Sequence, residues 1–205
     1  MLNIALPTGR MGEKAYRCFA DIGYSCPGME NQNRKLVFVD EERGLRYMLV
    51  KPKDVAMYVE YGAADIGVVG RDVIMESQPD IYELLDLGFG KCRFAVAAPE
   101  GWHDDLSRPL RVATTYCKVT NEYFLSVGRQ IETIKLHGSV ELAPLIGLSD
   151  VIVDIVESGT TLRENKLVVV AEIAPSSARL IANKSSYQFN RALIDEIRSK
   201  MEAAK

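Results

Sequence analysis

A short loop of glycine and hydroxyl residues carries the strongest chemical signal in the sequence. Apolar residues over 150–156 predict a buried strand, and Ser158, Gly159, Thr160 and Thr161 follow it before a short predicted helix. Glycine allows close approach to the backbone, and the N–H groups at a helix start favour an anion. The loop therefore predicts a phosphate site, although a helix start capped by Ser or Thr would show the same pattern.

Two acidic residues flank this loop. Asp154 lies within the predicted strand, and Glu157 directly precedes Ser158. A carboxylate repels a phosphate, but its oxygens accept hydrogen bonds from sugar hydroxyls. Phosphate donors beside carboxylate acceptors therefore predict a phosphorylated ribose as the ligand.

The elements that must position these residues alternate along the chain. Strands are expected at 2–6, 36–39, 45–50, 65–69, 93–98, 110–114, 131–136, 150–156, 167–173 and 178–183. Helices are expected at 13–22, 53–61, 121–127, 140–146, 160–165 and 187–204, the last with Phe189, Ala192, Ile194, Ile197 and Met201 on or near its inner side. The polar run 99–109 is predicted to be a loop. This alternation indicates an α/β fold with mainly parallel sheets.

Composition restricts the class of protein. The chain has 205 residues, with 47% hydrophobic and 26% charged residues, which is typical of a globular protein and excludes a disordered one. A net charge of -3 makes nucleic acid an unexpected partner. No apolar run approaches the ~18 residues of a membrane span, and the start of the chain does not read as a signal peptide. Four dispersed cysteines and two histidines favour reduced thiols in the cytoplasm over a disulfide framework or a protein-built metal site.

From Glu141 to Leu162 the sequence resembles the signature of the ATP phosphoribosyltransferases, which catalyse the first step of histidine biosynthesis. The matching residues are Glu141, Gly147, Ser149, Ile152, Asp154, Ser158, Gly159, Thr161 and Leu162. Further matching segments include ALPTGR, KPKDVAMYVEYGAADIGVVGRDV, DLGFGKCRFAVA and LHGSVELAPLIGL. The resemblance covers nearly the whole chain. Because the sequence ends soon after its last predicted helix, it is similar to the short form of the family.

The resemblance implies a two-lobed, periplasmic-binding-protein-like (type II) fold, with two mainly parallel sheets and a cleft between them. Lobe I would comprise 1–92 and 171–205, and lobe II, with the phosphate loop, 93–170. The implied reaction joins ATP and phosphoribosyl pyrophosphate into phosphoribosyl-ATP and pyrophosphate, with Mg²⁺ bound mainly through the substrate. The implied assembly is a homodimer within a hetero-octamer that also contains a regulatory subunit similar to histidyl-tRNA synthetase.

The resemblance also assigns roles to residues. Asp154 would accept hydrogen bonds from the ribose, and the loop of Glu157, Ser158, Gly159, Thr160 and Thr161 would hold its 5′-phosphate. Gly9 and Arg10, after the first strand, would face phosphate together with Arg34 and Lys51. From the sequence alone these cations read as solvated surface charges.

Two acidic residues keep alternative interpretations. Glu141 would orient the ribose or a magnesium-bound water, or serve as a carboxylate at a helix start. Asp65 would accept hydrogen bonds from ATP, or cap the start of its strand.

The sequence departs from the family pattern at two positions. Thr8 stands where the family often has Lys, and Cys117 where it commonly has Pro. We expect Cys117 to be a packing residue, and His137 a polar loop residue, because the transfer needs neither a nucleophile nor a base.

Two other functions compete with the transferase. A two-lobed anion- or nucleotide-binding protein without catalysis has the same alternation of elements. A phosphoribosyltransferase for a free base is disfavoured, because its usual loop has two adjacent acids where this chain has Asp154 followed by Ile155.

Overall fold

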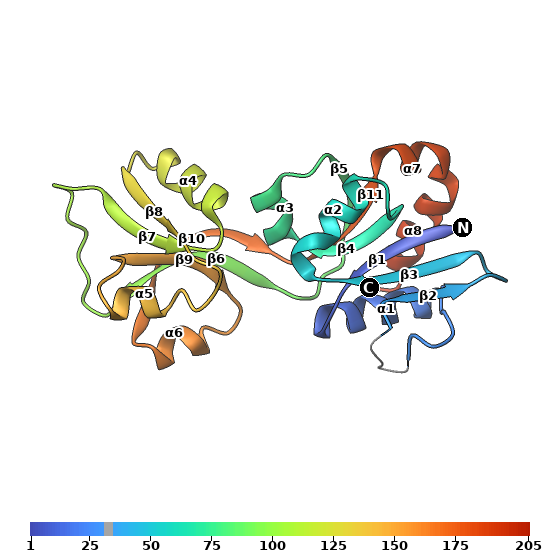
Figure 1. The fold of residues 1–205 in the computed structure, drawn as a ribbon, viewed down its shortest axis with the longest axis horizontal. Helices are drawn as coiled ribbons and strands as arrows, with labels where there is room; N and C mark the ends of the chain where they lie inside the picture. The colour runs from blue at the N-terminus through green and yellow to red at the C-terminus, as the bar shows by residue number, and fades with distance from the viewer. Residues whose placement is uncertain (31–34) are drawn as a thin grey trace. The chain divides into compact units, whose positions relative to one another are not determined.

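The computed structural model describes residues 1–30 and 35–205, and the chain divides into two compact units (Figure 1). Unit 1 consists of Met1–Ile74, Gln78–Gly90 and Ser177–Lys205, and unit 2 of Met75–Ser77 and Lys91–Ser176. The expected division after residue 170 differs at one strand. Because β10 (Leu167–Ser176) pairs with β6 (Cys92–Pro99) from end to end, residues 171–176 lie in unit 2.

Unit 1 contains a six-stranded sheet in the order β2-β3-β1-β4-β11-β5. Its strands are β1 (Leu2–Pro7), β2 (Val37–Asp40), β3 (Leu45–Val50), β4 (Ile66–Gly70), β5 (Ile81–Asp86) and β11 (Ala178–Asn183). The three central strands β3, β1 and β4 are parallel, so their carboxyl ends share one edge of the sheet.

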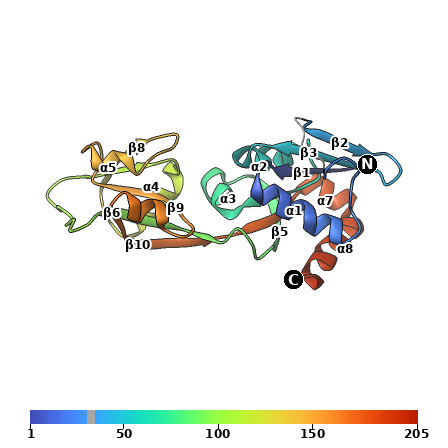
Figure 2. The same ribbon diagram turned by 90° about the horizontal axis from the view of Figure 1, so that it is seen from below.

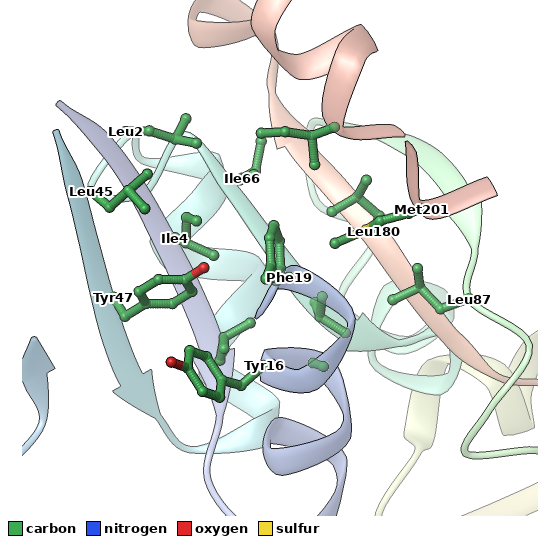
Figure 3. Close-up of a cluster of buried hydrophobic side chains, with 14 of the residues drawn as sticks. Leu2, Ile4, Tyr16, Phe19, Leu45, Tyr47, Ile66, Leu87, Leu180 and Met201 are labelled. Atoms are coloured by element: carbon green, nitrogen blue, oxygen red, sulfur yellow. The ribbon is translucent and has the colours of Figure 1, made fainter. Parts of the chain in front are cut away.

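Helices cover both faces of this sheet (Figure 1, Figure 2). On one face, α1 (Arg10–Asp21) and α8 (Arg191–Ala203) pack against Ile4, Ile66 and Leu180, with Phe19 of α1 fully buried (Figure 3). On the other, α2 (Val55–Glu60), which follows the short helix η1 (Pro52–Asp54), and α3 (Arg71–Ser77) pack against Ala5. Successive residues of β1 thus serve opposite faces, as the pleat requires.

Unit 2 contains a five-stranded sheet in the order β10-β6-β9-β7-β8. Its parallel strands are β7 (Leu110–Thr114), β8 (Ile131–Lys135) and β9 (Val151–Val156). One face is covered by α4 (Cys117–Ser126), and the other by α5 (Leu142–Leu145) and α6 (Thr160–Glu164). The strand β9, which leads into the predicted phosphate loop, is therefore central and largely buried.

The structure confirms an α/β fold with two sheets, but the expectation that both are mainly parallel is wrong. Parallel pairing joins β3, β1 and β4 in one sheet and β9, β7 and β8 in the other, whereas β2, β5, β6, β10 and β11 all pair antiparallel. The turn 41–44 is too short for the crossover that parallel strands require, so β2 and β3 form a hairpin. The sequence analysis also missed α3 and the edge strand β5, whose burial does not alternate.

The C-terminal helix differs from its prediction. It is divided into α7 (Lys184–Phe189) and α8 by Asn190, whose backbone leaves the helical region at φ -119° and ψ 28°. The break interrupts the 3.6-residue period, so Phe189 is 87% exposed and Ala192 is exposed as well, whereas Ile194, Ile197 and Met201 are buried as expected.

Cys18, Cys26, Cys92 and Cys117 are free thiols in the structure. In the part of the chain that the structure describes, no helix has the length and apolar character needed to span a membrane.

Candidate functional site

The predicted phosphate loop follows β9, at the edge where the parallel strands of unit 2 end. Gly159 has φ 72° and ψ 8°, the left-handed conformation that glycine adopts without a steric penalty. Thr160 begins α6, and Leu162 anchors that helix in the core. Glu157, Ser158, Thr160 and Thr161 are all exposed, so their polar groups are accessible to a ligand.

Hydrogen bonds within the loop fix its hydroxyl groups. Ser158 Oγ lies 3.0 Å from Thr160 Oγ1, and Thr160 N donates to Ser158 Oγ at 3.4 Å. Arg163, which the sequence analysis did not select, donates from Nη1 to the Ser158 carbonyl (3.1 Å) and from Nη2 to Thr160 Oγ1 (3.0 Å). Its position three residues after Thr160 on a helix was the signal available in the sequence.

Asp154 lies in β9, two residues before the strand ends. Ile152 and Val156 point into the core beneath α5 and α6, and alternation places Asp154 on that same face. Its side chain is half-buried, and Oδ1 accepts a hydrogen bond from the Ile155 N–H at 2.8 Å. The structure therefore brings a carboxylate and the glycine loop to one face of one strand.

Glu141 occupies the position just before α5, which packs on that face through Ala143. The Glu141 side chain is half-buried and makes no capping hydrogen bond to the helix. Its place at a helix start fits both interpretations, a carboxylate stabilised by the helix dipole and a group directed to a ligand.

A second group of predicted residues lies in unit 1. Gly9 has φ 85° and ψ -166°, a backbone region open essentially to glycine alone, and Arg10 is the first residue of the 12-residue helix α1. Lys51 follows β3, whose Val50 pairs with Pro7 of β1. Gly9, Arg10 and Lys51 thus share the edge where these parallel strands end.

The electrostatics of this edge favour an anion. Arg10 and Lys51 are exposed, and neither forms an ion pair with any residue in the described ranges 1–30 and 35–205. A cation in the first turn opposes the helix dipole, and a bound anion would reverse that penalty. Thr8 is exposed beside them, and its N–H donates to the Val50 carbonyl at 2.8 Å.

Asp65 is placed apart from these residues. It precedes β4 and therefore lies at the opposite, amino edge of the unit 1 sheet. Its Oδ2 accepts from the Asn3 N–H (2.7 Å) and Asn3 Nδ2 (3.0 Å), and its Oδ1 from Ser186 Oγ (2.6 Å). These contacts match the alternative interpretation of Asp65 as a cap at the start of a strand.

Three further residues complete the predicted set. Arg34 lies outside the residues that the structure describes. His137 is exposed in the loop after β8. Cys117 is half-buried at the start of α4, where burial and then the charge of Glu76 raise the pKa of its thiol. A raised pKa disfavours the thiolate, so Cys117 is poorly suited to act as a nucleophile.

Comparison with solved structures places the fold. The alkanesulfonate-binding protein SsuA from Xanthomonas axonopodis pv. citri has a TM-score of 0.59 at 10% identity, with 99% of this chain and 72% of that chain covered. This likeness concerns the fold alone. The ATP phosphoribosyl transferase (HisG:HisZ) complex from Thermotoga maritima contains a chain with a TM-score of 0.87 at 32% identity, covering 99% of this chain and 98% of that chain.

Sequence comparison agrees. The HisG family, described as ATP phosphoribosyltransferase, matches residues 51–203. An ATP phosphoribosyltransferase of Brachyspira hyodysenteriae is 54% identical over 98% of both chains. Another, of Caldanaerobacter subterraneus subsp. tengcongensis, is 51% identical over 96% of this chain and 94% of the relative. The chain therefore belongs to the ATP phosphoribosyltransferase family and is a pentosyltransferase.

Proposed function

We propose that the loop of residues 157–161 holds the 5′-phosphate of phosphoribosyl pyrophosphate, and that Asp154 accepts hydrogen bonds from the ribose hydroxyls. The observation that carries this proposal is the pairing of a left-handed glycine loop with a carboxylate on the strand leading into it. Backbone N–H groups and the hydroxyls of Ser158, Thr160 and Thr161 supply donors for the phosphate. Carboxylate oxygens supply the acceptors that a bare anion would not need.

The cations of unit 1 have a complementary role in this proposal. Arg10 and Lys51, with the N–H groups beside Gly9, would bind phosphates of ATP or of the departing pyrophosphate. Arg34 is proposed as a third cation on the basis of the family resemblance. Charge on the leaving group rises as its bond to ribose breaks, so fixed positive charges stabilise the transition state more than the ground state.

The reaction requires no covalent bond between the protein and its substrates. N1 of adenine forms a bond to C1 of the ribose with its lone pair, while the C1–O bond to pyrophosphate breaks and its electrons leave with the pyrophosphate. N1 carries no proton that must be removed before attack. Alignment of two large anions is therefore the main requirement, and a general base is unnecessary.

Magnesium fits the residues present only as an ion held mainly by the substrate. Within the described ranges, no three His, Cys, Asp or Glu side chains gather closely enough to hold a metal ion. Asp154 or Glu157 would supply a carboxylate, with substrate oxygens and water as the other ligands, an arrangement that Mg²⁺ commonly adopts. The bound ion would neutralise charge on the pyrophosphate. Glu141 would orient the ribose or a magnesium-bound water.

The proposed assembly follows the short form of the family. The similar chain from Thermotoga maritima is described as part of a complex with a second protein, HisZ. We expect this chain to form a homodimer within a hetero-octamer that contains a histidyl-tRNA-synthetase-like regulatory subunit, and to act in the cytoplasm.

An assay of product formation tests the proposal. The formation of phosphoribosyl-ATP is followed by absorbance in the presence of ATP, phosphoribosyl pyrophosphate, Mg²⁺ and pyrophosphatase, once with and once without the regulatory subunit. Product in either condition is expected, whereas substrate binding without product in both would favour a binding protein.

A pair of glycine variants tests the loop itself. Gly159→Val should abolish binding of phosphoribosyl pyrophosphate, because the side chain both strains the backbone and blocks the phosphate. Gly101→Val is the matched control, since Gly101 has φ 75° with open space around it. Equal binding by the two variants would contradict the phosphate loop.

A further inference from the structure

The Arg163 guanidinium covers the phosphate loop. Besides its hydrogen bonds to the Ser158 carbonyl and Thr160 Oγ1, its Nη1 would lie 3.4 Å from a Cβ built on Gly159. The side chain therefore spans the glycine and holds the residues on both sides of it. Arg163 itself is exposed, so the core does not require this arrangement.

The hydrogen bonds also determine which hydroxyl proton remains available. Each hydroxyl has one proton to donate and two lone pairs. The Ser158–Thr160 contact of 3.0 Å uses one of the two hydroxyl protons, while Arg163 donates to Thr160 Oγ1 and the Thr160 N–H donates to Ser158 Oγ. Whichever hydroxyl donates in the shared bond, one proton is left for an anion. The oxygen that carries it is polarised by the guanidinium directly or through one hydrogen bond.

Charge gives Arg163 a second effect. Between residues 154 and 164 the acidic residues are Asp154, Glu157 and Glu164, and Arg163 is the only Lys or Arg. Three carboxylates near the loop oppose a phosphate dianion. The guanidinium offsets part of that repulsion, because it lies directly beside Ser158, Gly159 and Thr160.

We infer that Arg163 is a positioning residue for the 5′-phosphate of the substrate: it holds Ser158 and Thr160 so that a polarised hydroxyl and the loop N–H groups face the phosphate. This inference rests on the proposed function of the loop. Because Arg163 acts through its neighbours, its removal should weaken binding of the 5′-phosphate without altering the other end of the substrate.

The test measures binding to Arg163→Met by calorimetry, with Mg²⁺ present and ATP absent. The ligands are phosphoribosyl pyrophosphate, ribose 5-phosphate and inorganic pyrophosphate. We expect about tenfold weaker binding of the two ligands that carry a 5′-phosphate, equivalent to about 1.4 kcal/mol. Pyrophosphate should bind as it does to the wild type. An equal loss for pyrophosphate would overturn the inference.

Two further variants separate position from charge. Lys166→Met also removes one exposed cation three residues away and should change affinity less than about twofold. Arg163→Lys keeps the charge, but one ammonium cannot reproduce the fork of donors, so about threefold weaker binding is expected. Equal losses of affinity in Arg163→Met and Lys166→Met would contradict a positioning role. Wild-type affinity in Arg163→Lys would contradict it as well, and this second test holds even if Arg163→Met folds poorly.

A double-mutant cycle with Thr160→Val isolates the hydrogen bond. Arg163→Met and Thr160→Val remove the same contact, so their combined loss should be clearly smaller than the sum of the single losses. Additive losses would show that Arg163 does not act through Thr160. Gly159→Val distinguishes failure of the proposed loop function from failure of the inference about Arg163. If Gly159→Val still binds ribose 5-phosphate, the proposed loop function is wrong. If Gly159→Val loses this ligand while Arg163→Met binds it like the wild type, only the role of Arg163 is wrong.

Discussion

The two candidate phosphate-binding edges are built differently. In unit 2 the loop after β9 is organised by its own hydrogen bonds among Ser158, Thr160 and Arg163. In unit 1 the glycine and the cations follow two different strands, and the register Pro7–Val50 brings Lys51 to the same sheet edge as Arg10. The first edge is local in sequence, whereas the second depends on tertiary pairing.

Under the proposed function, this difference would separate recognition of the ribose phosphate from neutralisation of the charge on pyrophosphate. A loop with internal hydrogen bonds presents donors in fixed directions, which suits a phosphate attached to a rigid sugar. Two exposed cations on flexible stems adapt to phosphates whose charge changes during the reaction. We therefore expect variants in unit 2 to affect ribose 5-phosphate, and variants in unit 1 to affect pyrophosphate and ATP.

The largest expected effect comes from Gly12→Ala in unit 1. A Cβ at Gly12 would lie 1.7 Å from the Pro7 carbonyl oxygen, so α1 must move away from the end of β1. We expect the free energy of unfolding to fall by more than about 3 kcal/mol and the melting temperature to fall by roughly 6–12 °C. Gly138→Ala, with nothing within 4 Å, should change stability by less than about 0.5 kcal/mol. The rate of hydrogen exchange should rise in β1 and α1. An equally large rise in β9, which belongs to unit 2, would contradict a local effect.

Asp154→Asn should produce the next largest effect, in ligand binding. The amide cannot accept charge-assisted hydrogen bonds from ribose hydroxyls, which corresponds to about 1.5–3 kcal/mol, or about 10–150-fold weaker binding of ribose 5-phosphate. Calorimetry measures this loss, with Glu164→Gln as the control that removes an equal charge from α6. Unchanged affinity in Asp154→Asn would refute the ribose-binding role.

Asp150→Asn tests how firmly β9 is held in place. Hydrogen bonds from Arg108, and then from Arg111, hold the pKa of the Asp150 carboxyl well below its usual range, although burial opposes them. We expect the free energy of unfolding of Asp150→Asn to be lower than that of the wild type by about 1–2 kcal/mol at pH 7. Because the folded-state pKa is depressed, this contribution is complete above about pH 4 and fades as pH falls further. Chemical denaturation from pH 7 to pH 3 should show the difference in stability between the two proteins beginning to narrow below about pH 4 without vanishing at pH 3, because the depressed pKa keeps the folded-state carboxylate ionised. A difference that is already lost at pH 5 would contradict this origin.

Arg10→Met should give a small effect with two signs. Loss of the cation should weaken pyrophosphate binding about fivefold, which is about 1 kcal/mol. The same change removes an unfavourable charge from the first turn of α1 and should stabilise the protein by about 0.3–1 kcal/mol. Calorimetry and thermal unfolding measure the two effects, with Lys14→Met on the same helix as the control. Weaker binding together with lower stability would indicate a structural role for Arg10.

Sequence reasoning predicted the unit 2 site more fully than the unit 1 site. Asp154 and residues 157–161 form one contiguous segment, so local rules for strands, glycine and helix starts were sufficient to place them. The sequence could not distinguish the two interpretations of Asp65, because its partners Asn3 and Ser186 lie far from it along the chain. Arg163 was missed because a lone arginine on a short helix is ordinarily a surface charge.

Local periodicity and contiguous motifs in the sequence were enough to predict the order of most strands and helices, the glycine loop after β9 and the family. The tertiary structure was needed to show the antiparallel pairing of β2, β5, β6, β10 and β11, the break at Asn190, the edge shared by Arg10 and Lys51, and the separation of Asp65 from that edge. Strand pairing and side-chain contacts join residues distant in sequence, and no local pattern specifies them.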